Sequence, residues 1–240
     1  MTDQLLETLP YWKALTETER QKVRATASVR DFTPGEILYG RNVSCIGMIH
    51  VLAGEVRAYL LSKEGREITL FRVEEGDNCI LSASCVLAHI SFESTMVATK
   101  PSRILVIPAS VFEALSEQNI HVRCFSYELA TRRFSTVVFV MQMILFSGLD
   151  TRLASFLLQE YNAISGEEIR ITQEQIAQNI NSAREAVTRM LKRFAEDGII
   201  ENRRGVIRIL DPDRLKALSA DQRHFLQEKC DQVTEIKKML

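Results

Sequence analysis

The chain has 240 residues, of which 46% are hydrophobic and 25% charged, and this is the composition of a soluble globular protein long enough for two domains. No run of about 18 apolar residues and no basic start followed by an apolar stretch is present, so we expect a cytoplasmic protein without membrane span or signal peptide. The formal net charge of −1 excludes a broad polybasic binder of nucleic acid. The odd count of five cysteines, without a CxxC pair, argues against a disulfide scaffold or zinc ribbon.

The first 27 residues have helical patterning, and Thr16 is a suitable N-cap for a second short helix. From about residue 28 to 108, glycines punctuate short runs in which polar and apolar residues alternate, namely 46–52, 56–61, 67–73 and 104–107. Such runs predict closely spaced β-strands. A double-sheet jelly roll is the simplest barrel that they can build.

A long helix is predicted between Glu117 and Phe146, where neither proline nor glycine occurs. Its apolar residues are three or four apart, as in a coiled-coil seam, and they are Tyr127, Ala130, Phe134, Val137, Met141 and Ile144. Val138 and Leu145 add a second apolar flank. One barrel cannot cover both flanks, so we expect the same helix of a second subunit to cover one. The alternative is a core helix buried wholly within one chain.

Gly148 interrupts the helical pattern and predicts a hinge before a further amphipathic helix over 151–161. The segment 171–192 then predicts two short helices joined by a tight turn. Thr172 is a suitable N-cap for the first helix, Asn181 can adopt the left-handed backbone of the turn, and Ser182 can cap the second helix. The second helix turns Val187, Met190, Leu191 and Phe194 inward and leaves a charged outer face that suits a DNA major groove.

Beyond this helix, Gly198 ends the helical pattern, and residues 199–200 and 206–210 flank Arg203, Arg204 and Gly205. This pattern predicts a β-hairpin wing with a basic tip. Between Asn181 and Arg208 we count seven basic and four acidic residues, a local charge of +3. The basic surface is therefore local, and a dimer would double it. The remaining residues, 212–240, are predicted to be helical and charged.

In its motifs the chain resembles the Crp/Fnr superfamily of bacterial transcription regulators. The resemblance covers about residues 10–218, and it includes the ordered turn glycines at 35, 54, 65 and 76 and the helix-turn-helix pattern from Thr172 to Arg189. It implies an α+β fold with a jelly-roll sensor domain over 1–118, a dimerisation helix over 119–147 and a winged helix-turn-helix domain over 148–240. It also implies a homodimer that binds double-stranded DNA and acts with RNA polymerase.

The resemblance assigns base reading to Arg184, Glu185 and Arg189. Arginine can donate two hydrogen bonds to guanine and glutamate can accept one from cytosine, so the chemistry agrees. The wing arginines are expected to hold phosphate. The complete predicted DNA-binding set is Thr172, Gln173, Ser182, Arg184, Glu185, Thr188, Arg189, Lys192, Arg203 and Arg204.

The sensor segment, residues 76–95, departs from the cyclic-nucleotide members of this superfamily. The arginine that holds the phosphate is missing, and its nearest equivalent, Glu93, would repel a phosphate, so neither cyclic AMP nor cyclic GMP is expected. Iron–sulfur sensors carry clustered cysteines near the N-terminus, whereas the first cysteine here is Cys45. That cluster is not expected either.

We expect instead an unidentified small effector in a mostly apolar pocket lined by Leu81, Ser82, Ser84, Val86, Leu87, Phe92 and Tyr127. The runner-up is a heme or redox sensor that uses Cys79, Cys85 or His89, although buried, inert thiols are the commoner case. A metal-dependent jelly-roll enzyme would need two close histidines on one strand. The four histidines lie at 50, 89, 121 and 224, so we expect no metal site and no enzyme. A module that docks a protein rather than DNA is the remaining alternative, against which the helix-turn-helix argues.

Overall fold

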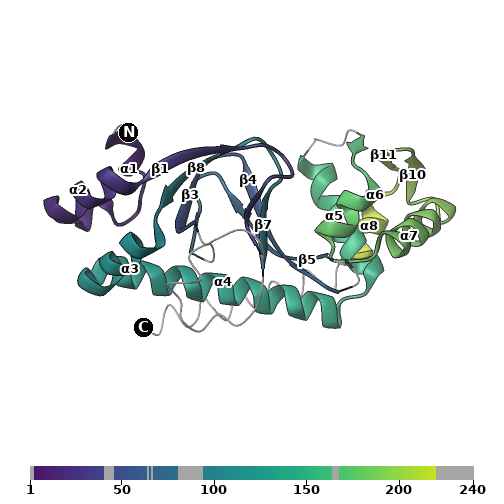
Figure 1. The fold of residues 1–240 in the computed structure, drawn as a ribbon. Coiled ribbons are helices and arrows are strands. Elements are labelled where there is room, and N and C mark those ends of the chain that lie inside the picture. Colours follow the sequence, from purple (N-terminus) through teal and green to yellow (C-terminus); the bar gives the residue numbers. More distant parts are fainter. Residues whose placement is uncertain are drawn as a thin grey trace. The chain divides into compact units, whose positions relative to one another are not determined.

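The computed structural model describes residues 3–40, 46–63, 65, 67–80, 94–163 and 168–219. They belong to two compact units, Met1–Phe139 and Val140–Leu240, which are described separately below. The first unit holds the barrel and the second holds the helix-turn-helix (Figure 1). The expected α+β fold, with a β-rich N-terminal domain, a long helix and a C-terminal helix-turn-helix domain, is confirmed.

Short helices precede the barrel: α1 (Asp3–Leu6), η1 (Trp12–Ala14) and α2 (Glu17–Thr26). Thr16 caps α2 as predicted, because its side chain accepts from the Glu19 backbone N–H while the Glu19 carboxylate accepts from the Thr16 N–H. These hydrogen bonds satisfy donors that the first helical turn would otherwise leave open. The helices bury their apolar side chains in a cluster shared with the barrel, including Leu6, Leu9, Trp12 and Val23.

Within the described residues, the barrel has two four-stranded sheets, and all their paired strands are antiparallel. One sheet has the order β1 (Ser28–Phe32), β8 (Ser102–Ile107), β3 (Met48–Ala53) and β6 (Asn78–Cys79). The other has the order β2 (Ile37–Tyr39), β7 (Thr95–Ala98), β4 (Glu55–Leu61) and β5 (Glu67–Glu74). The four predicted strand segments correspond to β3, β4, β5 and β8.

Alternation along the strands separates two buried clusters. Ile49, Val51, Val56, Ala58 and other side chains fill the space between the sheets. Their strand neighbours on the outer face of the first sheet, such as Met48 and Leu105, pack against the helices. Gly47 needs to be glycine, because it has a φ of +112° and a Cβ there would lie 2.0 Å from the Ile107 carbonyl oxygen.

Two helices follow the barrel, α3 (Ala109–Gln118) and α4 (Ile120–Phe146), separated by Asn119 in an extended conformation. The predicted long helix therefore begins at Ile120. Asn119 explains the break, since its amide nitrogen donates to the Ala14 carbonyl oxygen and its side-chain oxygen accepts from the His121 N–H. Val122, Phe125 and Leu129 then pack the first half of α4 against the barrel.

The C-terminal unit contains α5 (Leu149–Ala163), β9 (Ile169–Arg170), α6 (Gln173–Asn179), α7 (Arg184–Glu196), β10 (Ile200–Arg203), β11 (Val206–Ile209) and α8 (Pro212–Leu218). The three strands form one sheet in the order β10-β11-β9. Its apolar face shares a core with the helices, which includes Leu153, Ile176, Val187, Leu191 and Ile207. Of the predicted C-terminal helical segment, residues 212–218 are helical and residues 220–240 lie outside the described part.

The two compact units divide within α4, after Phe139, and Gly148, the predicted hinge, lies inside the second unit. The physical reason is the Arg152 side chain on α5, which donates to the carbonyl oxygens of Met143 and Ser147 at 3.2 and 2.6 Å and to that of Ile180 at 3.1 Å. These contacts join the last turn of α4 to α5 and to the helix-turn-helix. The final residues of α4 therefore belong with the second unit.

Candidate DNA-binding interface

The first helix of the helix-turn-helix, α6, begins in a capping box. The Thr172 hydroxyl accepts from the Gln175 backbone N–H at 3.2 Å, and the Gln175 side-chain oxygen accepts from the Thr172 N–H at 2.9 Å. The first turn is thereby held with its polar side chains outward. Thr172, which we predicted to contact DNA, uses its hydroxyl in this cap.

The turn between the two helices depends on Asn181, which has a φ of +52°, the left-handed value predicted from the sequence. The predicted cap by Ser182 is wrong. The N-cap of α7 is Ala183, without a side-chain cap, and the Ser182 N–H donates to the Ala177 carbonyl oxygen at 2.9 Å. Because Asn181 reverses the chain direction, Ser182 still belongs to the turn and α7 begins at Arg184.

The two faces of α7 differ sharply. Val187, Leu191 and Phe194 are at most 2% exposed and lie in the core of the unit. The opposite face is exposed and consists of Arg184, Glu185, Thr188, Arg189 and Lys192. This is the division that the sequence predicts for a helix which packs on one side and can enter a groove on the other.

Neighbouring side chains orient several of these groups. The Thr188 hydroxyl lies 2.6 Å from the Gln173 side-chain oxygen and 2.9 Å from the Arg184 carbonyl oxygen. With its oxygen facing Thr188, the Gln173 amide retains its NH₂ group as an outward donor. The Lys192 ammonium is 3.7 Å from the Glu196 carboxylate, an exposed i,i+4 pair. Arg184 and Arg189 have no ion-pair partner among the described residues.

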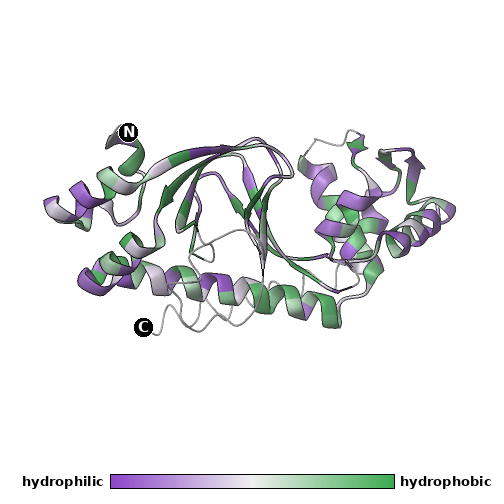
Figure 2. Cartoon of the chain, viewed as in Figure 1, coloured by the Kyte–Doolittle hydropathy of each residue, from purple (hydrophilic) through white to green (hydrophobic). Residues whose placement is uncertain are grey.

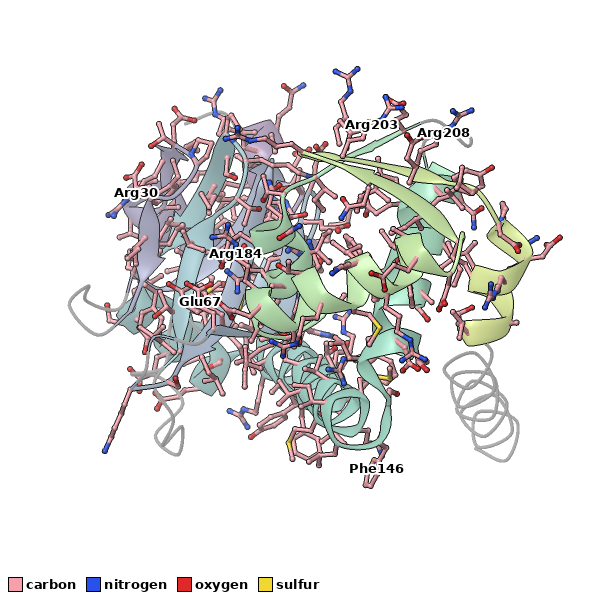
Figure 3. All side chains as sticks on the ribbon, turned by 90° about the vertical axis from the view of Figure 1, so that its right-hand side faces the viewer. Arg30, Glu67, Phe146, Arg184, Arg203 and Arg208 are labelled. Atoms are coloured by element: carbon pink, nitrogen blue, oxygen red, sulfur yellow. The ribbon has the colours of Figure 1, made fainter. Side chains whose placement is uncertain are left out.

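The predicted wing is the hairpin of β10 and β11. In its antiparallel register Glu201 lies opposite Arg208, and Arg203 lies opposite Val206. The turn at its tip contains Gly205 with a φ of +76°. Arg203 and Arg208 project from this wing, and Arg184 projects from the start of α7 (Figure 3). Sequence alternation predicts the exposed side of the hairpin but not the partners of its charges.

The two arginines at the wing tip, Arg203 and Arg204, differ in whether a carboxylate lies beside them. The Arg203 guanidinium donates to one Glu201 carboxylate oxygen from Nε at 3.0 Å and from Nη2 at 2.7 Å. This hydrogen bond, together with the negative charges of Glu201 and Glu168, raises the pKa of Arg203. Arg204 is exposed and has no hydrogen bond or ion pair with any residue that the structure describes.

A cleft of about 730 Å³ separates the wing from the helix-turn-helix. Its lining combines apolar side chains of the sheet and α6 with polar side chains of both walls, and it comprises Ile171, Thr172, Gln173, Glu174, Ile176, Arg184, Asn202, Arg203, Arg204, Gly205 and Ile207. Five of the ten predicted DNA-binding residues thus share one concave surface: Thr172, Gln173, Arg184, Arg203 and Arg204. Glu174 and Asn202 were missed, although their places beside a cap and in the hairpin could have indicated them.

The exposed apolar stripe of α4 differs in part from the predicted seam. Ala130 packs partly buried against the cluster under the N-terminal helices, and Val137 against the cluster between the sheets, so both belong to the barrel side. The exposed apolar residues are Ile120, Tyr127, Phe134 and Met141, which are seven residues apart, and Leu145 and Phe146. Figure 2 shows the hydrophobic character of α4 toward its C-terminal end.

Comparisons with known proteins agree with these two units. Residues 29–119 match the cyclic nucleotide-binding domain family, and residues 151–218 match the Crp-like helix-turn-helix domain family. A protein from Eubacterium rectale that is assigned to the Crp/Fnr family of transcriptional regulators has 37% sequence identity and a TM-score of 0.83, covering 89% of this chain and 99% of its own. The chain belongs to the Crp/Fnr family. It is therefore a Crp/Fnr-type transcription regulator with a helix-turn-helix DNA-binding domain.

More distant solved structures share the fold. FixK2 from Bradyrhizobium japonicum has 18% identity and a TM-score of 0.59, covering 80% of this chain and 97% of its own. The c-di-GMP-responsive regulator CLP from Xanthomonas campestris has 14% identity and a TM-score of 0.63, covering 81% of this chain and 99% of its own. None of the curated protein sequences compared with the chain matches it.

The structure describes few of the predicted sensor residues of this Crp/Fnr protein. Leu81, Ser82, Ser84, Val86, Leu87 and Phe92, like Cys85 and His89, lie outside the described residues. Tyr127 is 66% exposed on α4, so it does not line a pocket within the described part of the barrel. Cys79 is fully buried between the sheets. The described residues contain no group of three His, Cys, Asp or Glu side chains that could hold a metal ion.

Proposed function

We propose that this Crp/Fnr regulator binds an inverted-repeat operator as a homodimer, with one α7 helix in the major groove of each half-site and half-site centres about one helical turn apart. The observation that carries this proposal is the exposed face of α7, where two arginines without an ion-pair partner among the described residues flank Glu185 and Thr188. Arg184 and Arg189 would donate to guanine, Glu185 would accept from cytosine, and the wing would contact phosphate.

The occupant proposed for the apolar stripe of α4 is the same helix of a second copy. The seven-residue spacing of Ile120, Tyr127, Phe134 and Met141 supports a parallel, in-register pair, since identical helices then place identical residues opposite each other. Exposed Cys124 and partly exposed Val138 continue the stripe between them.

A membrane is the competing occupant, because α4 is long and apolar enough to cross one, with a mean hydropathy of 1.3 over its best window. Against this, the first half of α4 carries Arg123, Glu128, Arg132 and Arg133 and packs Val122, Phe125 and Leu129 into the barrel unit. A second α4 would cover the stripe without removing those contacts.

A cross-linking experiment tests the dimer and its register. A short bis-maleimide should join Cys124 to the partner subunit's Cys124 in the full chain, and Cys124→Ser should abolish the product. Light scattering should give a dimer, and binding selection should yield a palindrome. A monomer in dilute solution, a dimer without the Cys124 cross-link, or an operator without two-fold symmetry would each contradict this arrangement. Partitioning of the protein into lipid vesicles would favour the membrane.

We further propose that the barrel responds to a small effector other than a cyclic nucleotide. The support is chemical: residues 76–95 contain neither arginine nor lysine to hold a phosphate, and apolar side chains cluster between the sheets. To regulate DNA binding, the effector must favour one arrangement of the recognition helices over another. Thermal-shift screening with cyclic AMP, cyclic GMP, heme and a metabolite panel tests this proposal. A large stabilisation by either nucleotide would contradict it, and a Soret band of the purified protein would favour the heme or redox alternative through Cys79, Cys85 or His89.

A further inference from the structure

The contact between Glu201 and Arg203 has the geometry of a bound anion. Both residues lie on β10, two positions apart, so their side chains project from the same face of the strand. Two N–H groups of the Arg203 guanidinium, at Nε and Nη2, converge on one carboxylate oxygen. An arginine holds a phosphate oxygen with the same donors.

The same guanidinium lies in the wall of the cleft between the wing and the helix-turn-helix. Arg184 and Arg204 share this lining and have no acidic partner in the described chain. The positive charge of Arg203, in contrast, is neutralised by Glu201 before any DNA binds. A phosphate that approaches the Nε–Nη2 edge of Arg203 must therefore displace Glu201, while one that approaches Arg204 displaces only water and counterions. Among the described residues, the wing tip thus has one arginine paired with a carboxylate, Arg203, beside one without an ion-pair partner, Arg204.

We infer that Glu201 is an internal competitor for DNA phosphate, which lowers the affinity of the wing for DNA of any sequence. This inference rests on the proposed DNA-binding surface and adds a residue that sets its strength. Because Glu201 and Arg203 together are neutral, their contact with a phosphate brings no net positive charge to the DNA. Removal of the Glu201 charge leaves Arg203 able to neutralise one phosphate and to release its condensed counterion.

The test is Glu201→Gln in the full-length protein, which keeps the size of the side chain and removes its charge. We expect about two- to fivefold tighter binding per subunit, equally on the selected operator and on a scrambled duplex, since exposed ion pairs have modest strength. The slope of log K against log salt should steepen by about 0.9 per subunit. Asp213→Asn is the control, because Asp213 is an exposed carboxylate paired with Lys216 on α8, outside the cleft.

A double-mutant cycle separates competition from long-range repulsion. The gain from Glu201→Gln should disappear in an Arg203→Ala background, because no guanidinium is then released. A gain that persists there, or an unchanged affinity and salt slope for Glu201→Gln, would overturn the inference. The proposed DNA-binding function fails separately, when the wild-type protein binds neither duplex.

Discussion

The helices α4 and α7 each have one buried side and one exposed side, but they differ in how their sequences distribute polarity. In α7 the buried side is apolar and the exposed side is charged. In α4 both sides are apolar over much of its length, so Leu129 is 4% exposed while Phe134 is 69% exposed. Polarity thus identifies the inner face of α7, and it cannot identify the inner face of α4.

This difference shows why the sequence pattern separates the buried and exposed faces of α7 but mixes buried and exposed residues in the predicted seam of α4. Burial of an apolar side chain is favourable against any apolar surface, whether it belongs to the same chain or to another. The predicted seam therefore combined Tyr127, Phe134 and Met141, which are exposed, with Ala130 and Val137, which the barrel unit covers. The expected second flank, with Val138 and Leu145, belongs to the exposed stripe.

The largest expected effect comes from a charge on the exposed stripe of α4. Phe134→Glu should convert the dimer into monomers, and operator affinity should fall on the order of 100- to 10,000-fold because the second half-site is no longer tethered to the first. Light scattering and titration against operator DNA measure both effects. Ser135→Glu, exposed on the same helix beside the stripe, is the control and should leave the dimer intact. Equal effects of both variants would mean that the stripe is not the contact surface.

The contribution of each inner face to stability can be compared by replacing one buried leucine with alanine on α4 and one on α7. Leu129→Ala on α4 and Leu191→Ala on α7 should each lower the free energy of unfolding of their own unit by about 2–5 kcal/mol, because each leaves a cavity. Met141→Ala, at a position that is 53% exposed, should leave the unfolding free energy of the monomeric Phe134→Glu background nearly unchanged. Denaturant unfolding measures these values, and a loss for Met141 as large as that for Leu129 would contradict the orientation of α4.

On the outer face of α7, Arg184→Ala and Arg189→Ala should each cost about 1–3 kcal/mol at the selected operator and less on a scrambled duplex. Arg204→Ala at the wing should weaken binding to both duplexes alike. Competition binding distinguishes these outcomes. Equal losses on both duplexes for Arg184→Ala would remove its role as a base reader.

A smaller effect is expected from Thr188, which we infer to be a positioning residue for Gln173. Thr188→Val preserves the shape of the side chain but removes the hydroxyl 2.6 Å from the Gln173 oxygen, so DNA affinity should fall by about 0.5–1.5 kcal/mol. In a Gln173→Ala background the same change should cost nothing further. A full additive loss in that background would mean that Thr188 contacts DNA independently.

The smallest expected effect comes from His50, a buried barrel residue that is linked through Asn78 to α4. His50 is 4% exposed, and burial lowers its pKa despite the hydrogen bond with the side-chain oxygen of Asn78; the backbone carbonyl oxygen of Asn78 accepts from Arg133 of α4. A lowered pKa means that the unfolded chain binds the proton first, so the stability of the barrel unit should fall as pH decreases below about 6.5. Unfolding at pH 7 and pH 5 should show a smaller difference for His50→Gln than for the wild type; an unchanged difference would exclude His50 as its cause.

Local patterns in the sequence determined much of this protein. The strands of the barrel, the caps at Thr16 and Thr172, the left-handed turn at Asn181 and the inner face of α7 all follow from residues a few positions apart, because alternation, capping and turn geometry act over short distances. They were sufficient to indicate a winged helix-turn-helix protein.

Tertiary structure decided what depends on distant partners. Packing against the barrel assigned Ala130 and Val137 to the inner side of α4, and the Asn119 contacts with Ala14 and Glu19 separated α3 from α4. Arg152, which donates to the Met143 carbonyl near the end of α4, also donates to the Ile180 carbonyl 28 residues further along the chain from Arg152. These outcomes depend on which groups meet after the chain has folded, because an apolar side chain can pack on any apolar surface and an arginine can donate to any well-placed oxygen.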